Sequence, residues 1–138
     1  MTQEEKQLLY KVLCAMLPYG VKLHVEYTFK LPFNAHTIEG DTDLVEINIV
    51  NGEYRVLTSL DEYVINRFPL EYIKPYLRPM SRMTVPEKLE WIKLTANPDP
   101  TSFVVKVGEF LHSHHLDYQD LIPMGLALEA PAGMYKNN

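Results

Sequence analysis

The sequence has a single cysteine, Cys14, among its 138 residues, so no disulfide can form within the chain. This composition is typical of proteins kept in a reducing compartment. The chain also lacks any run that approaches the roughly 18 apolar residues of a membrane span. Its first six residues, MTQEEK, lack the basic and apolar regions of a signal peptide. These absences predict a cytoplasmic protein that does not enter a membrane.

The chain also has fewer basic than acidic residues. The chain carries 13 Lys and Arg against 18 Asp and Glu, which gives a net charge of −5. Binding of nucleic acid along the whole surface needs clustered lysines and arginines that neutralise phosphates. The acidic balance therefore disfavours nucleic acid as a partner, although it leaves a local basic patch open.

Recognised catalytic motifs are missing too. The sequence holds no G-x-S-x-G element, no glycine-rich phosphate loop and no H-E-x-x-H pair. It therefore predicts no catalytic residue and no cofactor, and an enzyme is the less favoured class of protein.

The remaining composition is that of an ordinary globular domain. Hydrophobic residues make up 46% of the chain and charged residues 22%. A chain of this length buries roughly two thirds of the surface that its unfolded form exposes, which is enough for a hydrophobic core. No internal repeat or flexible linker interrupts the sequence. We therefore expect residues 1–138 to form a single domain.

Local patterns in the first half predict a helix followed by strands. Thr2 and Glu5 form a capping box at the start of a helix. Residues 21–30 alternate between apolar and polar side chains, as a half-buried strand does. Residues 31–42 are predicted to be a loop with room for a short strand at 36–39.

The clearest pattern is a hairpin over residues 44–58. Asn51-Gly52 is the strongest short signal for a two-residue turn between antiparallel strands. A turn at these two positions places apolar Ile49 opposite apolar Tyr54 and keeps polar residues together on the other face. Turn chemistry and hydrophobic pattern thus agree on one register.

The last third of the chain is predicted to be helical. Thr84 and Glu87 form a second capping box. An apolar stripe follows it at helical spacing: Val85, Leu89, Ile92 and Ala96. Further helices are expected after Thr101 or Ser102 and after Asp117.

These elements predict an α+β fold with an N-terminal helix, a small antiparallel sheet that contains the hairpin at 44–58, and a helical C-terminal third. A curled, SH3-like barrel and an open sheet both fit the strand pattern. Residues 59–65 are expected to form a further short strand or a turn.

A basic and aromatic stretch stands out at residues 67–82, which we call the basic-aromatic segment. It holds four basic residues, one acid and three aromatic residues, and its three prolines stiffen it. Tyrosine and arginine are frequent in protein interfaces, and stacked aromatics beside cations also suit nucleic acid. Trp91, which lies off the helical stripe, is a further candidate. We predict these binding residues: Tyr72, Lys74, Tyr76, Arg78, Arg82 and Trp91. The alternative is a structural strap across the sheet, with its aromatic side chains buried.

Three histidines and an acid lie close together near the C-terminus: His112, His114, His115 and Asp117. A zinc site needs three or four converging ligands, and no ligand motif frames these residues. The surface end of a helix, where histidines interact favourably with the helix dipole, is the favoured explanation. No metal is therefore predicted.

Residues 73–84, IKPYLRPMSRMT, resemble the phrase KPYLRPMSSMT of a family of small proteins encoded in prophages and mobile elements of gut Bacteroidetes. The resemblance resumes at residues 114–122, 125–131 and 133–135, where the family reads much like HHFDYRGLIEKGLALEAPEGMY. Residues 14–22, CAMLPYGVK, are similar to its CMLPYGVK.

The resemblance has gaps. Arg82 stands where the family has serine, Asp120 stands where it has glycine, and residues 31–70 match none of its phrases. The family carries no assigned activity, cofactor or site residue. The resemblance therefore implies a setting only, that of a phage or mobile-element protein in a bacterial cytoplasm.

The leading hypothesis is a non-enzymatic accessory protein that binds another protein, of phage or host. The alternative is a small nucleic-acid-associated protein that uses the basic-aromatic segment. A metal-dependent enzyme that uses the cluster from His112 to Asp117 is the third hypothesis.

Overall fold

The computed structural model describes residues 1–60 and 67–135. Contacts within the chain divide it into two compact units, Met1–Tyr76 and Leu77–Asn138. The expectation of a single domain over 1–138 stays a prediction, and each unit is described by itself. The short strand or turn expected at 59–65 falls mostly on residues 61–66, which lie outside the described residues. Within the described ranges, no helix is long and apolar enough to cross a bilayer.

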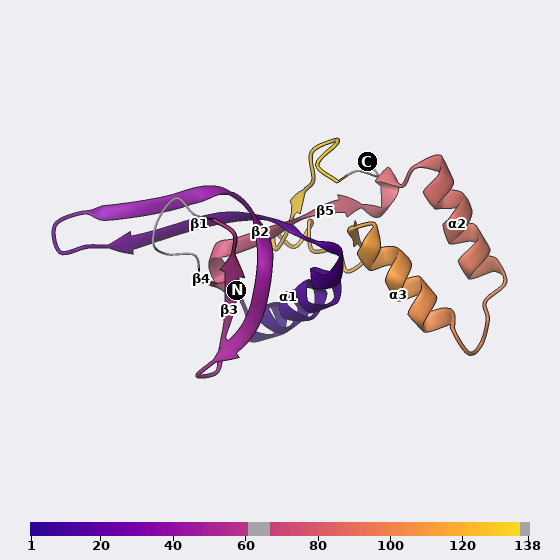
Figure 1. The fold of residues 1–138 in the computed structure, drawn as a ribbon, viewed down its shortest axis with the longest axis horizontal. Helices are drawn as coiled ribbons and strands as arrows, with labels where there is room; N and C mark the ends of the chain where they lie inside the picture. Colours follow the sequence, from indigo (N-terminus) through magenta and orange to yellow (C-terminus); the bar gives the residue numbers. More distant parts are fainter. Residues whose placement is uncertain (61–66, 136–138) are drawn as a thin grey trace. The chain divides into compact units, whose positions relative to one another are not determined.

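The first unit consists of one long helix and an antiparallel sheet (Figure 1). Helix α1 (Gln3–Met16) leads into the short 3-10 helix η1 (Leu17–Tyr19). The strands are β1 (Lys22–Lys30), β2 (Ala35–Val50), β3 (Glu53–Thr58), β4 (Arg67–Pro69) and β5 (Ile73–Pro79), with the 3-10 helix η2 (Leu70–Tyr72) before β5. Their order in the sheet is β4-β3-β2-β1-β5, and the boundary between the units falls inside β5.

Helix α1 begins as the capping box predicts. The Thr2 hydroxyl accepts a hydrogen bond from the Glu5 backbone N–H at 3.1 Å, and the Glu5 carboxylate accepts one from the Thr2 N–H at 2.8 Å. One face of the helix is buried: Leu9, Val12, Leu13 and Met16. The Tyr10 ring lies 4.8 Å from the Tyr54 ring of β3, so α1 packs on the sheet. The unit has an apolar layer between helix and sheet.

Strand β2 corrects the sequence-based prediction. Residues 31–42 were expected to be mainly a loop, but β2 begins at Ala35 and pairs with β1 over nine residue pairs, from Lys22↔Asp43 to Lys30↔Ala35. Polar residues and a glycine obscured the strand in the sequence. The exposed residues Thr37, Glu39, Asp41 and Asp43 lie on the outer face of the β1–β2 ladder. Gly40 lies on the other face, where Ile38 and Thr42 are buried.

The hairpin of β2 and β3 is confirmed. Ile49 pairs with Tyr54 and Asn48 with Arg55, which is the predicted register. Asn51 and Gly52 have φ values of 50° and 80°, as a type I′ turn requires at both central positions.

The second unit contains the C-terminal helices (Figure 1). Its elements after β5 are the 3-10 helix η3 (Met80–Arg82), α2 (Val85–Ala96), α3 (Phe103–Ser113), β6 (Leu116–Asp117) and β7 (Leu128–Glu129). The end of β5 pairs in parallel with β6, and β7 also pairs with β5. Trp91 and Leu94 of α2 pack against a buried cluster of Phe110, Leu111 and Leu116. The α+β fold is therefore confirmed.

Two predictions for this unit are wrong in detail. The helix expected after Asp117 is a series of turns, in which the Asp117 carboxylate accepts hydrogen bonds from the Leu121 and Ile122 N–H groups at 2.8 and 2.9 Å. The apolar stripe of α2 was expected to pack against the core, but it faces solvent. Its residues Val85, Leu89 and Ile92 are 70%, 60% and 56% exposed.

The turn geometry predicts the effect of Gly52→Val. A β-branched residue resists positive φ, so we expect the free energy of unfolding to fall by about 1 kcal/mol or more, measured by urea denaturation. Gly52→Asn is the matched control, since asparagine tolerates this conformation and should cost less. Equal stability of the two variants would contradict the type I′ turn.

Candidate functional site

A buried ion pair organises the second unit. Arg78 on β5 is fully buried, and so is most of Glu87 in the first turn of α2. The two Nη atoms of Arg78 each donate to one oxygen of Glu87 at 2.7 Å, which makes the pair bidentate. Arg78 also donates to the backbone carbonyls of His114 and Arg82, at 3.1 and 3.2 Å. His114 Nδ1 lies 2.8 Å from the same carboxylate. One carboxylate thus connects β5, α2 and the end of α3.

The surroundings of Glu87 favour its ionised form. Burial alone would raise the pKa of this carboxyl, but hydrogen bonds from Arg78 and from Thr84 outweigh it and lower the pKa to about 2. Thr84 contributes through the capping box, in which its N–H donates to Glu87 Oε1 at 2.7 Å. Glu87 therefore remains charged at neutral pH and balances the buried guanidinium.

This pair removes Arg78 from the predicted binding surface, because a fully buried side chain cannot reach a partner. Arg82 is also engaged: it donates to the Ala130 carbonyl at 2.7 Å and to Glu129 at 3.1 Å. The Trp91 ring lies 5.6 Å from the Phe110 ring and helps to attach α2 to α3. All three residues serve the architecture of the second unit.

The other predicted site residues belong to the first unit. Tyr72 is 43% exposed and its ring meets Tyr27 edge-on at 4.8 Å. Lys74 is exposed on β5, with His24 as its partner on β1. Tyr76 is half-buried, and its hydroxyl donates to Asp41 at 2.7 Å. The six predicted residues are thus divided between the two units, and only Tyr72 and Lys74 are well exposed.

The histidine cluster has four separate sets of contacts. His112 Nε2 lies 2.8 Å from the Tyr118 hydroxyl, and His115 is buried with its ring stacked on Tyr135 at 3.8 Å. His114 reaches Glu87, and Asp117 binds backbone N–H groups. The predicted setting at the surface end of a helix is wrong for His115. Each side chain stabilises a different piece of local structure.

A different group of potential metal ligands lies in the first unit. His24 and Glu26 on β1 and Glu39 on β2 place their ligand atoms within 4.8 Å of one another. Sequence analysis missed this group because it assigned residue 39 to a loop or short strand. The alternation in residues 21–30 already placed two of the three residues, His24 and Glu26, on the same face of one strand.

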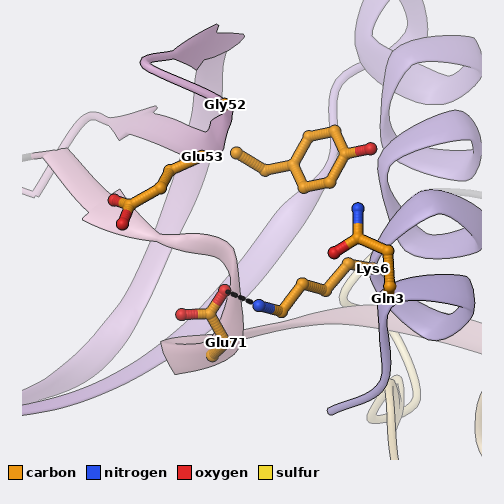
Figure 2. A pocket seen from close by; sticks show the side chains of 6 residues that line it. Gln3, Lys6, Gly52, Glu53 and Glu71 are labelled. Atoms are coloured by element: carbon orange, nitrogen blue, oxygen red, sulfur yellow. Dashed lines mark ion pairs between the residues drawn. The ribbon is translucent and has the colours of Figure 1, made fainter.

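Among the described residues, each unit has a small hollow. One, of about 70 Å³, lies in the first unit between α1 and the β2–β3 turn (Figure 2). Lys6 reaches Glu71 there, with 3.3 Å between Nζ and Oε1. A second hollow, of about 280 Å³, lies in the second unit beside Pro79 and Asp117. Ligand sites usually occupy about 300–1,000 Å³, and Asp117 is already used by backbone N–H groups. Neither hollow resembles an active site.

The outer face of α2 in the second unit is apolar and exposed. Val85, Leu89 and Ile92 follow one another at i, i+4 and i+7, and we call them the α2 stripe. Lys88 and Lys93 flank it and are exposed. On α3, Val104 and Val105 are 81% and 61% exposed.

Comparison of the chain with protein-family models, curated proteins and solved structures finds no significant match.

The ion pair predicts a large cost for Arg78→Met. The substitution leaves Glu87 buried without its main partner, so we expect the free energy of unfolding to fall by about 3–5 kcal/mol. Arg55→Met is the matched control, because the pair of Arg55 with Glu53 is exposed and should be worth less than about 1 kcal/mol. Similar losses in urea denaturation of both variants would contradict the assignment.

The pKa of Glu87 predicts a specific acid sensitivity. Its folded pKa of about 2 lies below the ordinary value of 4.5, so its stabilising contribution is complete above pH 4.5 and is lost as pH falls towards 2. This gap corresponds to about 3 kcal/mol at most. Glu87→Gln keeps the capping-box side chain but lacks the charge. The variant should lose less stability than the wild type between pH 6 and pH 2, and parallel losses would refute the prediction.

Proposed function

We propose that this chain is a non-enzymatic accessory protein that works by binding another protein, and that the α2 stripe is its docking surface. The observation that carries the proposal is the exposure of three large aliphatic side chains on one face of a well-capped helix. Apolar side chains grouped in this way mark interaction sites more often than scattered single ones do.

The spacing of the stripe suits one mode of recognition. A helix that docks in the groove of a partner uses apolar anchors at i, i+3 or i+4, and i+7. Val85, Leu89 and Ile92 meet this spacing. The first turn of the helix is stabilised before binding by Pro86 and by the capping box. This lowers the conformational entropy that is lost on association.

The exposure of the stripe has a structural cause. Glu87 lies on the side of α2 opposite the stripe, and it must face Arg78. Turning α2 to bury Leu89 would carry Glu87 into solvent and leave the guanidinium buried without its counter-charge, which costs several kcal/mol. The stripe is thus held outward, ready for a partner.

Charge specifies the chemistry of that partner. Lys88 and Lys93 flank the stripe on its two sides, although the chain as a whole carries a net charge of −5. We infer a partner protein with an apolar groove bordered by carboxylates. Such complementarity speeds association and excludes partners with basic borders.

The resemblance described above supplies the proposed setting. It supports a phage or mobile-element protein in a bacterial cytoplasm, with a partner from the phage or from the host. Nothing comparable supports nucleic acid as a ligand, because Arg78 is buried and Arg82 already binds Glu129 and a backbone carbonyl.

Site-specific photocrosslinking tests the proposal. A photoreactive phenylalanine analogue replaces Leu89 in the full chain, and the products formed in cells of the native host are identified by mass spectrometry. We expect cross-links to an apolar groove with acidic borders on one protein. Lys88→Glu with Lys93→Glu should reduce the yield about tenfold or more, because the borders would then repel.

The matched control carries the same analogue at Lys11, an exposed position on α1. Identical products from the two positions would refute docking through the stripe. Cross-links only to a second copy of the chain would also refute it, in favour of self-association.

A further inference from the structure

The outer face of the β1–β2 ladder contains an unusual set of cross-strand pairs. Most are complementary: Lys22 forms an ion pair with Asp43 at 2.7 Å, and the hydroxyls of Thr28 and Thr37 are 2.8 Å apart. Between these two pairs, His24 lies opposite Asp41 and Glu26 lies opposite Glu39. Like charges directly opposite one another destabilise a sheet. In the described part of the chain, Glu26 has no ion-pair partner to offset this repulsion.

His24 has a defined orientation beside the two glutamates. Its Nδ1 lies 2.9 Å from Asp41 Oδ1, and its Nε2 lies 3.5 Å from Glu39 Oε1. Asp41 also accepts a hydrogen bond from the Tyr76 hydroxyl at 2.7 Å. A carboxylate only accepts hydrogen bonds, so the contact with Asp41 places a ring proton of His24 on Nδ1.

In neutral His24 this arrangement leaves a lone pair on Nε2, which lies 3.5 Å from Glu39 Oε1, and Glu26 belongs to the same group of ligand atoms within 4.8 Å. Three electron-rich groups, from His24, Glu26 and Glu39, then converge with only lone pairs facing one another. A cation among them removes the conflict. Lys74, the neighbour of His24 on β5, forms no ion pair with either glutamate in the described structure.

We propose that His24, Glu26 and Glu39 bind a divalent transition-metal ion, with zinc as the best fit. Imidazole and carboxylate are both zinc ligands, and three protein ligands leave a fourth position for water. A tetrahedral ion with bonds of about 2.1 Å holds its ligands about 3.4 Å apart. The separation of 3.5 Å between Nε2 and Glu39 Oε1 already matches this value. Glu26 is exposed and has a ligand atom within 4.8 Å of both others.

Asp41 is a positioning residue for this site. A ligating histidine usually donates its other N–H to a carboxylate, which orients the ring and makes it a stronger ligand. Tyr76 orients Asp41 in turn, because its hydroxyl donates to Asp41 Oδ1 at 2.7 Å. The inference gives Tyr76 a role that is independent of the proposed protein docking through α2.

Calorimetric titration of the full chain, freed of metal by a chelator, with zinc chloride at pH 7.5 tests the inference. We expect one zinc ion per chain and a melting temperature that rises by several degrees with zinc. Cobalt should give the visible absorption of a four-coordinate site. Asp41→Asn should weaken zinc binding about tenfold to a hundredfold while keeping the stoichiometry.

Variants of the ligands separate a metal site from a simple ion pair. Glu39→Gln removes one ligand and the repulsion with Glu26, so the metal-free variant should melt higher than the metal-free wild type and gain nothing from zinc. Asp43→Asn is the matched control: it removes an exposed carboxylate of the same ladder and should leave zinc affinity unchanged.

Two results would overturn the inference. One is zinc affinity that is the same in the wild type, His24→Asn and Glu39→Gln. The other is absence of zinc binding by the wild type. A lower melting temperature of Glu39→Gln would then identify an ion pair of His24 with the carboxylates in place of a metal site. Circular dichroism verifies that each variant is folded.

Discussion

The arrangement of the second unit depends on the burial of one charged side chain, Arg78. A buried guanidinium is tolerated only with a well-placed counter-charge and further acceptors. Glu87 and two backbone carbonyls provide them. Because Glu87 lies in the first turn of α2, this requirement sets the rotation of the helix about its axis. The helix therefore packs through Trp91 and Leu94 and presents its most regular apolar stripe to solvent.

Structural and functional demands meet in the same few residues. The basic-aromatic segment contains the groups that organise each unit: Arg78 and Arg82 in the second, and Tyr76 with its bond to Asp41 in the first. Its cations and aromatic rings are largely committed to intramolecular contacts. The two surfaces that we propose for other molecules lie elsewhere, on the outer faces of α2 and of the β1–β2 ladder.

Those two faces differ in chemistry. The face of α2 is aliphatic with lysines on its borders, which suits an apolar partner surface with acids around it. The face of the β1–β2 ladder is polar and brings like charges together, which suits a cation. Both faces leave local interactions unsatisfied, while the rest of each element is internally complementary. Such local inconsistencies are typical of functional sites.

Local chemistry alone determined the capping boxes at Thr2 and Thr84, the alternation of β1 and the turn at Asn51-Gly52, since each depends on residues only a few positions apart. The register of β2 on β1, which joins His24 to Glu39, depends on pairing across the sheet, and the polar residues of 35–43 gave no periodic apolar signal for it. The rotation of α2 was decided by an ion pair between residues on different elements. Hydrophobic periodicity predicted the opposite face as buried, because it does not account for the cost of an unpaired buried charge.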